Sequence, residues 1–162
     1  MDDAKTATEV VVSTNPVTIR RRVKWGECDP AGVVYMVNYC EYVVSAYELF
    51  MAALLGETFQ NGKIRHRVAL PAKAFSIEFY ASLHPDDEFL MAVAITDVRT
   101  KTFDVAVRGR SIDHRDRFLA KLTPIAVDPF DRTAAPLPHA VTRRLQHYRE
   151  SGALDNGRAK DL

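Results

Sequence analysis

A long apolar stretch from Tyr39 to Leu55 constrains the fold more than any other part of the sequence. Asn38 and Glu41 have the spacing of a capping box at a helix start, and Gly56 can end a helix. The helix would be roughly 25 Å long at 1.5 Å per residue. Its polar side chains share one narrow stripe: Glu41, Ser45 and Glu48. Because a helix that is apolar on most sides is buried on most sides, the rest of the chain must wrap around it.

The flanking segments supply strands that could do so. Val17 to Trp25 alternates apolar and polar residues, as a half-buried strand does, although Arg21 interrupts the apolar face. Further strands are expected over four ranges: Val68–Ala81, Phe89–Arg99, Thr102–Ile112 and Arg117–Val127. Glu57 to Arg67 is typical of a polar connection, and His139 to Glu150 of a short amphipathic helix. One strand, a buried helix and a four-stranded meander predict an α+β fold, with an antiparallel sheet curled around the helix.

Length and composition fit a single domain. The 162 residues suggest one domain over 17–150, with flexible tails at 1–16 and 151–162. The net charge of +1 gives no general signal for nucleic acid. Cys28 and Cys40 do not make a disulfide framework and are expected to be buried thiols in a reducing compartment. Since the N-terminal residues resemble neither a signal peptide nor a membrane span, we expect a cytoplasmic protein without membrane contacts.

The loop before the helix contains an acid with two readings. Asp29-Pro30-Ala31-Gly32 has the sequence of a type I turn, so Asp29 could be a turn former and nothing more. Asp29 also precedes a helix start, where free backbone N–H groups stabilise negative charge. An acid beside such donors could carry out acyl chemistry.

The run Gly26 to Tyr35, with the sequence GECDPAGVVY and followed by Asn38-Tyr39, resembles the active-site loop of the 4-hydroxybenzoyl-CoA thioesterase family. The order of elements from about Val17 to Arg149 is similar as well. The resemblance implies a hotdog fold, which is an antiparallel sheet wrapped around a long central helix. It implies an acyl-CoA thioesterase that works on a small-molecule substrate without cofactor or metal.

The resemblance also implies roles for individual residues. Asp29 would act on the thioester carbonyl as nucleophile or general base, and the Met36 backbone N–H would stabilise the oxyanion. Tyr35 would contact the substrate. The hairpin residues Arg99, Lys101 and Thr102 would meet the phosphates of coenzyme A, although composition alone makes them an ordinary solvated turn. Thr100 stands where the family pattern has a second basic residue.

Other readings stay open beside this one. Glu48 could replace Asp29, because one branch of hotdog thioesterases uses a helix carboxylate, but a partly solvated acid is the simpler reading. An acyl-CoA hydratase would need an Asp/His pair, and no histidine lies close to Asp29 in sequence. A non-catalytic acyl-binding dimer is the third possibility. Trp25, Tyr35 and Phe75 could favour aromatic acids, but such residues are more often core.

The resemblance finally implies an assembly. The strand at about Val68 to Ala81 would pair with its copy across a two-fold axis, and the sites would be shared between subunits. We therefore expect a homodimer, or a homotetramer built from two dimers. Exposed sheet edges are normally covered or paired, which favours such an assembly independently.

Overall fold

A computed structural model describes residues 7–152. The strands are β1 (Glu9–Thr14), β2 (Val17–Arg22), β3 (Ala72–Phe79), β4 (Glu88–Val98), β5 (Phe103–Ser111) and β6 (Asp116–Pro124). The helices are η1 (Trp25–Glu27), α2 (Met36–Leu55), α3 (Phe59–His66) and α4 (His139–Ser151). The outer parts of both predicted tails, residues 1–6 and 153–162, lie outside the described residues.

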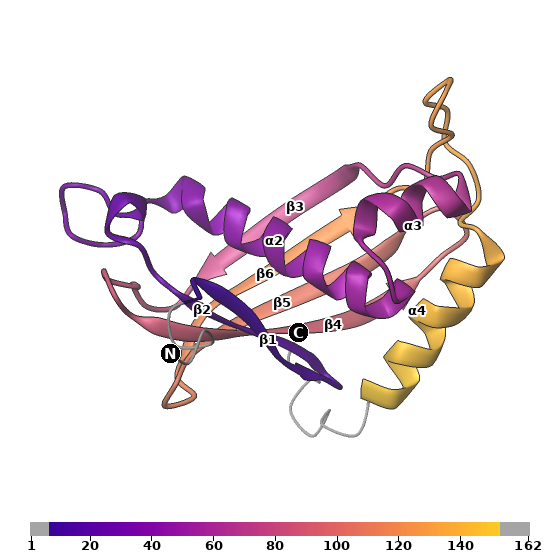
Figure 1. Ribbon diagram of the computed structural model, residues 1–162. Coiled ribbons are helices and arrows are strands. Elements are labelled where there is room, and N and C mark those ends of the chain that lie inside the picture. Colours follow the sequence, from indigo (N-terminus) through magenta and orange to yellow (C-terminus); the bar gives the residue numbers. More distant parts are fainter. Residues whose placement is uncertain (1–6, 153–162) are drawn as a thin grey trace.

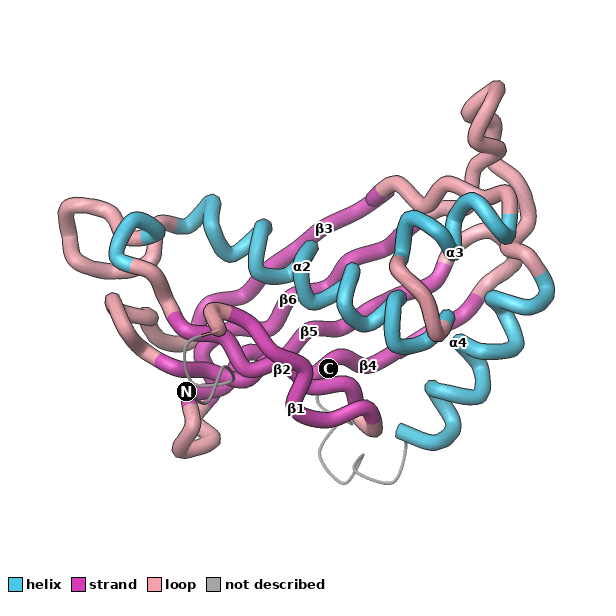
Figure 2. The backbone as a smooth tube through the Cα atoms, in the orientation of Figure 1, coloured by secondary structure: helices cyan, strands magenta, loops and turns pink. Residues whose placement is uncertain are grey.

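One antiparallel sheet with the order β1-β2-β4-β5-β6-β3 forms the body of the molecule. Helix α2 lies along one face of this sheet, while α3 and α4 gather at the end where α2 finishes (Figures 1 and 2). The predicted α+β architecture, a sheet with a long helix against it, is confirmed. No helix in the described range 7–152 is long and apolar enough to cross a membrane.

The predicted four-stranded meander is wrong. β4, β5 and β6 are consecutive neighbours, but β3 pairs with β6 at the far edge of the sheet and not with β4. Its place beside β4 is taken by β2, with Arg20 opposite Leu90. Pairing order is a non-local property, and the alternation of each strand does not encode it.

Two segments expected to be irregular are ordered. Glu9–Thr14, assigned to the N-terminal tail, forms strand β1 and pairs with β2. The polar connection expected at Glu57 to Arg67 contains helix α3, which begins after Thr58. The Thr58 hydroxyl accepts a hydrogen bond from the Asn61 N–H over 3.3 Å, as an N-cap does. These segments are short and strongly polar or continuously apolar, so their periodicity is weak.

Helix α2 begins three residues earlier than predicted. Its N-cap is Tyr35, which makes no side-chain capping bond, so the expected capping box of Asn38 and Glu41 is wrong. Asn38 instead lies in the first turn, and its Nδ2 donates to the Glu27 carbonyl over 2.6 Å. The predicted end is confirmed, because Gly56 adopts the left-handed conformation with φ of 73°.

The first half of α2 is seated on aromatic side chains of the sheet. The Tyr39 ring meets Phe79 and Phe118 edge-on, with centroids 5.0 and 5.3 Å away. Tyr42 packs on Phe89 at 5.4 Å. Contacts of this geometry fix the direction of the helix as well as burying apolar area.

Within residues 7–152, no other part of the protein covers the opposite face of α2. Met36 is 62% exposed, Val37 53% and Val44 51%, although all three are apolar. The expectation that one chain buries the helix on most sides is therefore wrong. β3 is exposed as well, with Phe75 at 37% and Phe79 at 44%. An apolar helix face and an apolar edge strand together are typical of a surface that another chain covers.

Candidate active site

The loop that carries Asp29 is a small closed hairpin. Cys28 and Val34 form an isolated bridge, and the Asp29 N–H donates to the Val33 carbonyl over 2.9 Å. One carboxylate oxygen of Asp29 accepts the Ala31 N–H over 2.8 Å. Gly32 closes the turn with φ of 78°, which a residue with a side chain rarely adopts. Asp29 does hold the turn, as the simpler reading required, and it does so with one oxygen only.

The other oxygen, Oδ2 of Asp29, accepts no hydrogen bond from any residue in 7–152. The side chain is neither fully buried nor fully exposed. It therefore retains an oxygen that can reach a substrate or a water molecule.

Met36 is the first residue of α2, and within the described chain its backbone N–H has no acceptor. An N–H in this position points along the helix axis with the positive end of the helix dipole. Tyr35, the residue before it, is 50% exposed. Loop and helix start thus bring together three of the predicted site residues, Asp29, Tyr35 and Met36.

A hollow of about 350 Å³ lies beside this helix start. Its walls come from the beginning of α2 and the end of β3: Val34, Met36, Tyr39, Phe79, Tyr80, Ala81 and Ser82. The volume is within the range of small-ligand sites, and most of the wall is apolar or aromatic.

The predicted phosphate-binding hairpin is present, but its first residue is already engaged. Arg99 contacts Asp97 at 2.6 Å and forms a double contact with Asp104 at 2.7 and 2.8 Å. Its Nε also donates to the hydroxyl of Thr102, which is buried. These carboxylates, Asp104 first, raise the pKa of Arg99 above its usual range. Lys101 is exposed and makes one long contact of 3.4 Å to the Ala134 carbonyl.

This hairpin and the Asp29 loop lie at opposite ends of the sheet. The Val34 N–H donates to the Leu83 carbonyl just before β4, whereas Arg99 follows the end of β4. Eleven strand residues separate these ends, which corresponds to about 35 Å at 3.3 Å per residue. Within one chain, the structure does not bring the two groups of predicted residues together.

Sequence reasoning missed a buried charge cluster beneath the loop. Arg21 points into the core and contacts Glu9 at 2.9 Å and Glu27 at 2.5 Å. The other oxygen of Glu27 accepts from the Tyr42 hydroxyl over 2.6 Å and from the Lys24 N–H over 2.9 Å. The interruption of an apolar strand face by Arg21 was the signal, because a buried cation requires acidic partners.

These contacts keep Glu27 ionised. Burial opposes its charge, but the hydrogen bonds from Tyr42 and Lys24 and the charge of Arg21 outweigh burial and hold the Glu27 pKa below its ordinary value. Burial is the main cause that raises the pKa of Tyr42, with the Glu27 contact adding to it. The cluster is thus an ionised carboxylate between an arginine and a neutral phenol.

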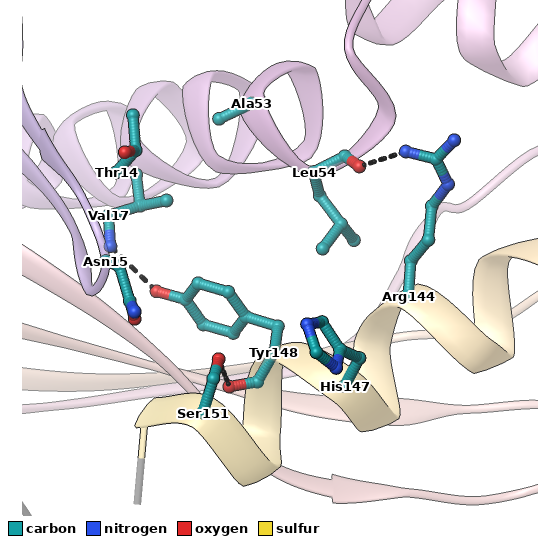
Figure 3. Close-up of a pocket in the computed structure, with 9 residues that line it drawn as sticks. All are labelled: Thr14, Asn15, Val17, Ala53, Leu54, Arg144, His147, Tyr148 and Ser151. Carbon is teal, nitrogen blue, oxygen red and sulfur yellow. Dashed lines mark hydrogen bonds between the residues drawn. The ribbon is translucent and has the colours of Figure 1, made fainter. Parts of the chain in front are cut away.

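A second hollow, of about 300 Å³, lies at the other end of α2 (Figure 3). Its polar groups are mostly occupied by the fold. The Tyr148 hydroxyl accepts from the Val17 N–H and donates to the Val93 carbonyl, while Arg144 donates to the Leu54 carbonyl at the end of α2. These bonds join α4 to the sheet and to α2, so this hollow is a structural junction.

The remaining candidates have clear positions. Glu48 is exposed in the C-terminal half of α2, whereas the Asp29 loop precedes the N-terminus of this helix. Burial, and then the charges of Glu27 and Asp29, raise the pKa of the Cys28 thiol, which disfavours a thiolate nucleophile. Cys40 is exposed on α2, so its predicted burial is wrong. Within residues 7–152, no three His, Cys, Asp or Glu side chains form a group that could hold a metal ion.

Comparison with known proteins gives a consistent result. A family model described as the thioesterase-like superfamily matches residues 23–145. A 1,4-dihydroxy-2-naphthoyl-CoA hydrolase of Crocosphaera subtropica is 25% identical over 134 residues, which cover 80% of this chain and 96% of that protein. A 4-hydroxybenzoyl-CoA thioesterase of Pseudomonas sp. strain CBS-3 is 28% identical over 88 residues, or 54% of this chain and 62% of that protein.

The structural comparison agrees with the sequence comparison. The crystal structure of a 1,4-dihydroxy-2-naphthoyl-CoA thioesterase from Synechocystis superposes with a TM-score of 0.72 at 25% identity. The match covers 80% of this chain and 94% of that one. The hotdog fold implied by the sequence resemblance is confirmed.

Proposed function

Since this chain belongs to the thioesterase-like superfamily and is a thioester hydrolase, we propose that it cleaves an acyl-CoA into the free acid and coenzyme A. The observation that carries the proposal is one loop that presents an acid, Asp29, and a free helix N–H, Met36, within a closed hairpin. An acid that acts on a carbonyl and a donor for the resulting oxyanion are the two groups that thioester hydrolysis requires.

In the proposed reaction, the ionised Asp29 starts the chemistry. As nucleophile, it attacks the thioester carbon, forms a mixed anhydride and releases the thiolate of coenzyme A, after which water cleaves the anhydride. As general base, it takes a proton from water, which attacks the same carbon directly; the C–S bond then breaks, and the thiolate of coenzyme A leaves and takes up the proton. Neither route needs a cofactor or a metal ion.

The Met36 N–H stabilises the negative charge that develops on the carbonyl oxygen. It has the free hydrogen and the position at a helix start that this role needs. One such donor is typically worth about 10² to 10³ in rate. Since the role belongs to the backbone, the methionine side chain is free to form part of the acyl pocket.

The acyl group is proposed to be aromatic. The hollow beside Met36 has aromatic walls in Tyr39, Phe79 and Tyr80, which suit a flat ring. The relatives named above act on hydroxylated aromatic acyl-CoA substrates, to judge from their names. Tyr35, half-exposed at the mouth of the loop, would contact the substrate.

The site is proposed to be shared between two subunits. Antiparallel pairing of β3 with its copy across a two-fold axis would reverse the ends of the sheet. The partner's hairpin would then come to the end of the molecule where Asp29 lies. This arrangement supports Lys101 as a contact for the phosphates of coenzyme A, and it would cover the exposed apolar residues of β3 and α2.

A thiol-release assay tests the function. The protein is incubated with benzoyl-, hydroxybenzoyl-, naphthoyl- and straight-chain acyl-CoAs, and free coenzyme A is measured. We expect turnover to be highest with an aromatic substrate. Binding without thiol release would instead identify a non-catalytic acyl-binding protein.

Water addition to an enoyl-CoA would identify a hydratase. His84 adjoins the loop, because Leu83 accepts the Val34 N–H, but its ring faces Asp87 at 3.5 Å. His84 is therefore paired with Asp87, in the turn before β4, and not with Asp29.

A further inference from the structure

Glu27 holds in place both the loop that carries Asp29 and the helix start that carries the Met36 N–H. Its backbone carbonyl accepts the Tyr35 N–H over 2.9 Å and the Asn38 side chain over 2.6 Å. The first bond closes the loop that carries Asp29, and the second secures the first turn of α2. Asp29 follows Glu27 by two residues, and Met36 follows Tyr35 directly.

The side chain of Glu27 is in turn held by three separate parts of the fold. Arg21 reaches it from β2, Tyr42 from α2 and the Lys24 N–H from the preceding turn. Arg21 also lies over the Tyr42 ring, 4.3 Å from its centroid. With strand and helix bonded to the same carboxylate, Glu27 can move little relative to either.

Stability alone does not account for this arrangement. A buried ion pair often contributes no more to stability than apolar side chains of the same size, because removing two charges from water is costly. Arg21 occupies an inward position of β2, where Val17 and Ile19 show that apolar side chains pack. Although Arg21 Nε and Glu9 Oε1 have no hydrogen-bond partner among the described residues, the contacts of Arg21, Tyr42 and Lys24 with the Glu27 carboxylate give it a directional geometry that an apolar contact does not provide.

The cluster also extends beyond the part of the chain that the family model matches. The matched residues are 23–145, and both Arg21 and Glu9 precede them. Glu9, on the edge strand β1, contacts Arg21 and accepts the Ser45 hydroxyl of α2 over 2.5 Å. Through these contacts the β1–β2 hairpin supports the Glu27 side chain and therefore the loop.

We infer that Glu27, oriented by Arg21 and Tyr42, is a positioning residue that sets Asp29 and the Met36 N–H relative to each other. The inference rests on the proposed thioesterase function for its effect on rate. A displacement of about 1 Å at a reacting group can cost up to 10²-fold in turnover. Loosening Glu27 should therefore lower kcat, while KM, which depends on the pocket and on coenzyme A contacts, changes little.

The test compares Tyr42→Phe and Glu27→Gln with the unmodified enzyme on its best acyl-CoA. Tyr42→Phe removes one hydrogen bond of the carboxylate, whereas Glu27→Gln removes its charge and replaces one accepting oxygen with a donor; both keep the side-chain shape. We expect kcat to fall about tenfold in each, at temperatures well below unfolding. The matched control is Glu88→Gln. It breaks the 2.7 Å ion pair between Glu88 and Arg20, the residue next to Arg21 on β2, and it should leave kcat unchanged.

A second measurement separates positioning from general destabilisation. In an Asp29→Asn background, Glu27→Gln should have a smaller further effect on the residual rate, because only the Met36 N–H then remains to be positioned. Equal losses in both backgrounds would overturn the inference, as would an unchanged kcat in both Glu27→Gln and Tyr42→Phe.

Hydrogen exchange tests the geometry without any substrate. The amides of Asp29 and Tyr35, bonded to Val33 and Glu27, should exchange faster in Glu27→Gln, while those in the middle of β5 stay protected. If the unmodified protein hydrolyses no acyl-CoA but exchange changes in this way, the proposed function fails and the positioning survives. If exchange in the loop is unchanged, the positioning fails whatever the activity.

Discussion

The Glu27 carbonyl and the Tyr35 N–H, joined over 2.9 Å, turn the segment between them into a closed loop whose turn begins at Asp29. Helix α2 begins at Met36, directly after the residue that makes this bond, so the same bond fixes the end of the loop and the start of the helix. Loop and helix start therefore cannot move independently, and a change in either one alters the distance between Asp29 and the Met36 N–H.

Asp29→Asn should abolish most turnover and leave the fold intact. The amide keeps the size and the turn-forming oxygen that accepts from Ala31, but it has no charge with which to start the reaction. We expect turnover to fall by at least ~10². Steady-state kinetics with a circular dichroism control measures this. Near-normal turnover would transfer attention to Glu48, with Glu48→Gln as the next variant.

Lys101→Ala should raise KM for acyl-CoA and leave kcat nearly unchanged, because it removes binding that is equal in ground and transition states. Arg99→Ala should have a smaller effect of its own, since Asp97 and Asp104 already neutralise that guanidinium. The double variant should also flatten the salt dependence of kcat/KM. An acyl-pantetheine substrate, which lacks the nucleotide, should not respond, and equal losses on both substrates would make the hairpin an ordinary turn.

The stabilising effect of Glu27 should depend on pH in one direction. Its pKa in the folded protein lies below its ordinary value, which is near 4.5. The contribution is therefore complete above pH 4.5 and is lost as the pH falls through the folded-state pKa. The difference in Tm between the unmodified protein and Glu27→Gln should be largest near neutrality and shrink in acid. A difference that grows on acidification would contradict the ionised cluster.

Gly109→Ala should destabilise the sheet strongly for such a small change. A Cβ at Gly109 would lie 2.1 Å from Cε1 of Phe118, whose side chain is fully buried and packs against Tyr39. Overpacking of this kind costs about 1–3 kcal/mol. Chemical denaturation should show the loss, whereas Gly152→Ala, whose Cβ meets no described residue within 4 Å, should change little.

Phe75→Lys should weaken the proposed dimer. Phe75 is exposed on the edge strand β3, and a charge there would be buried without a partner if β3 pairs with its copy. Sedimentation should show dimers or tetramers for the unmodified protein at micromolar concentration and monomers for the variant. A monomeric unmodified protein would end both the assembly and the shared site.

The sequence predicted the local elements well, because they depend on local periodicity. The β4–β5 hairpin, the end of α2 at Gly56 and helix α4 follow from alternation, a left-handed glycine and an amphipathic pattern. The order of strands and the pairing of β1 did not follow, since they depend on contacts between distant segments.

The site illustrates the same limit. Asp29, Tyr35 and Met36 lie close together in the sequence, so one motif indicated all three; they stay predictions as catalytic and binding groups. Arg21 could be recognised only as an interruption, because its partners Glu9 and Glu27 lie on other segments and acids are common in any chain. The contacts of Arg99 with Asp97 and Asp104 could not be predicted either, because they depend on the folded geometry of the hairpin.

The separation of Asp29 from Lys101 by about the length of β4 has a kinetic consequence for the proposed shared site. Neither subunit would contain a complete site by itself, so the activity would depend on how much of the protein is dimeric. With substrate below KM and protein below the dissociation constant of the dimer, the rate would rise with the square of the protein concentration. At substrate concentrations below KM, an equimolar mixture of Asp29→Asn and Lys101→Ala chains would be more active than the average of the two variants alone, because each mixed dimer would have one site with an intact acid and an intact cation. The length of one strand would then determine that two chains are needed to bind one acyl-CoA with full affinity.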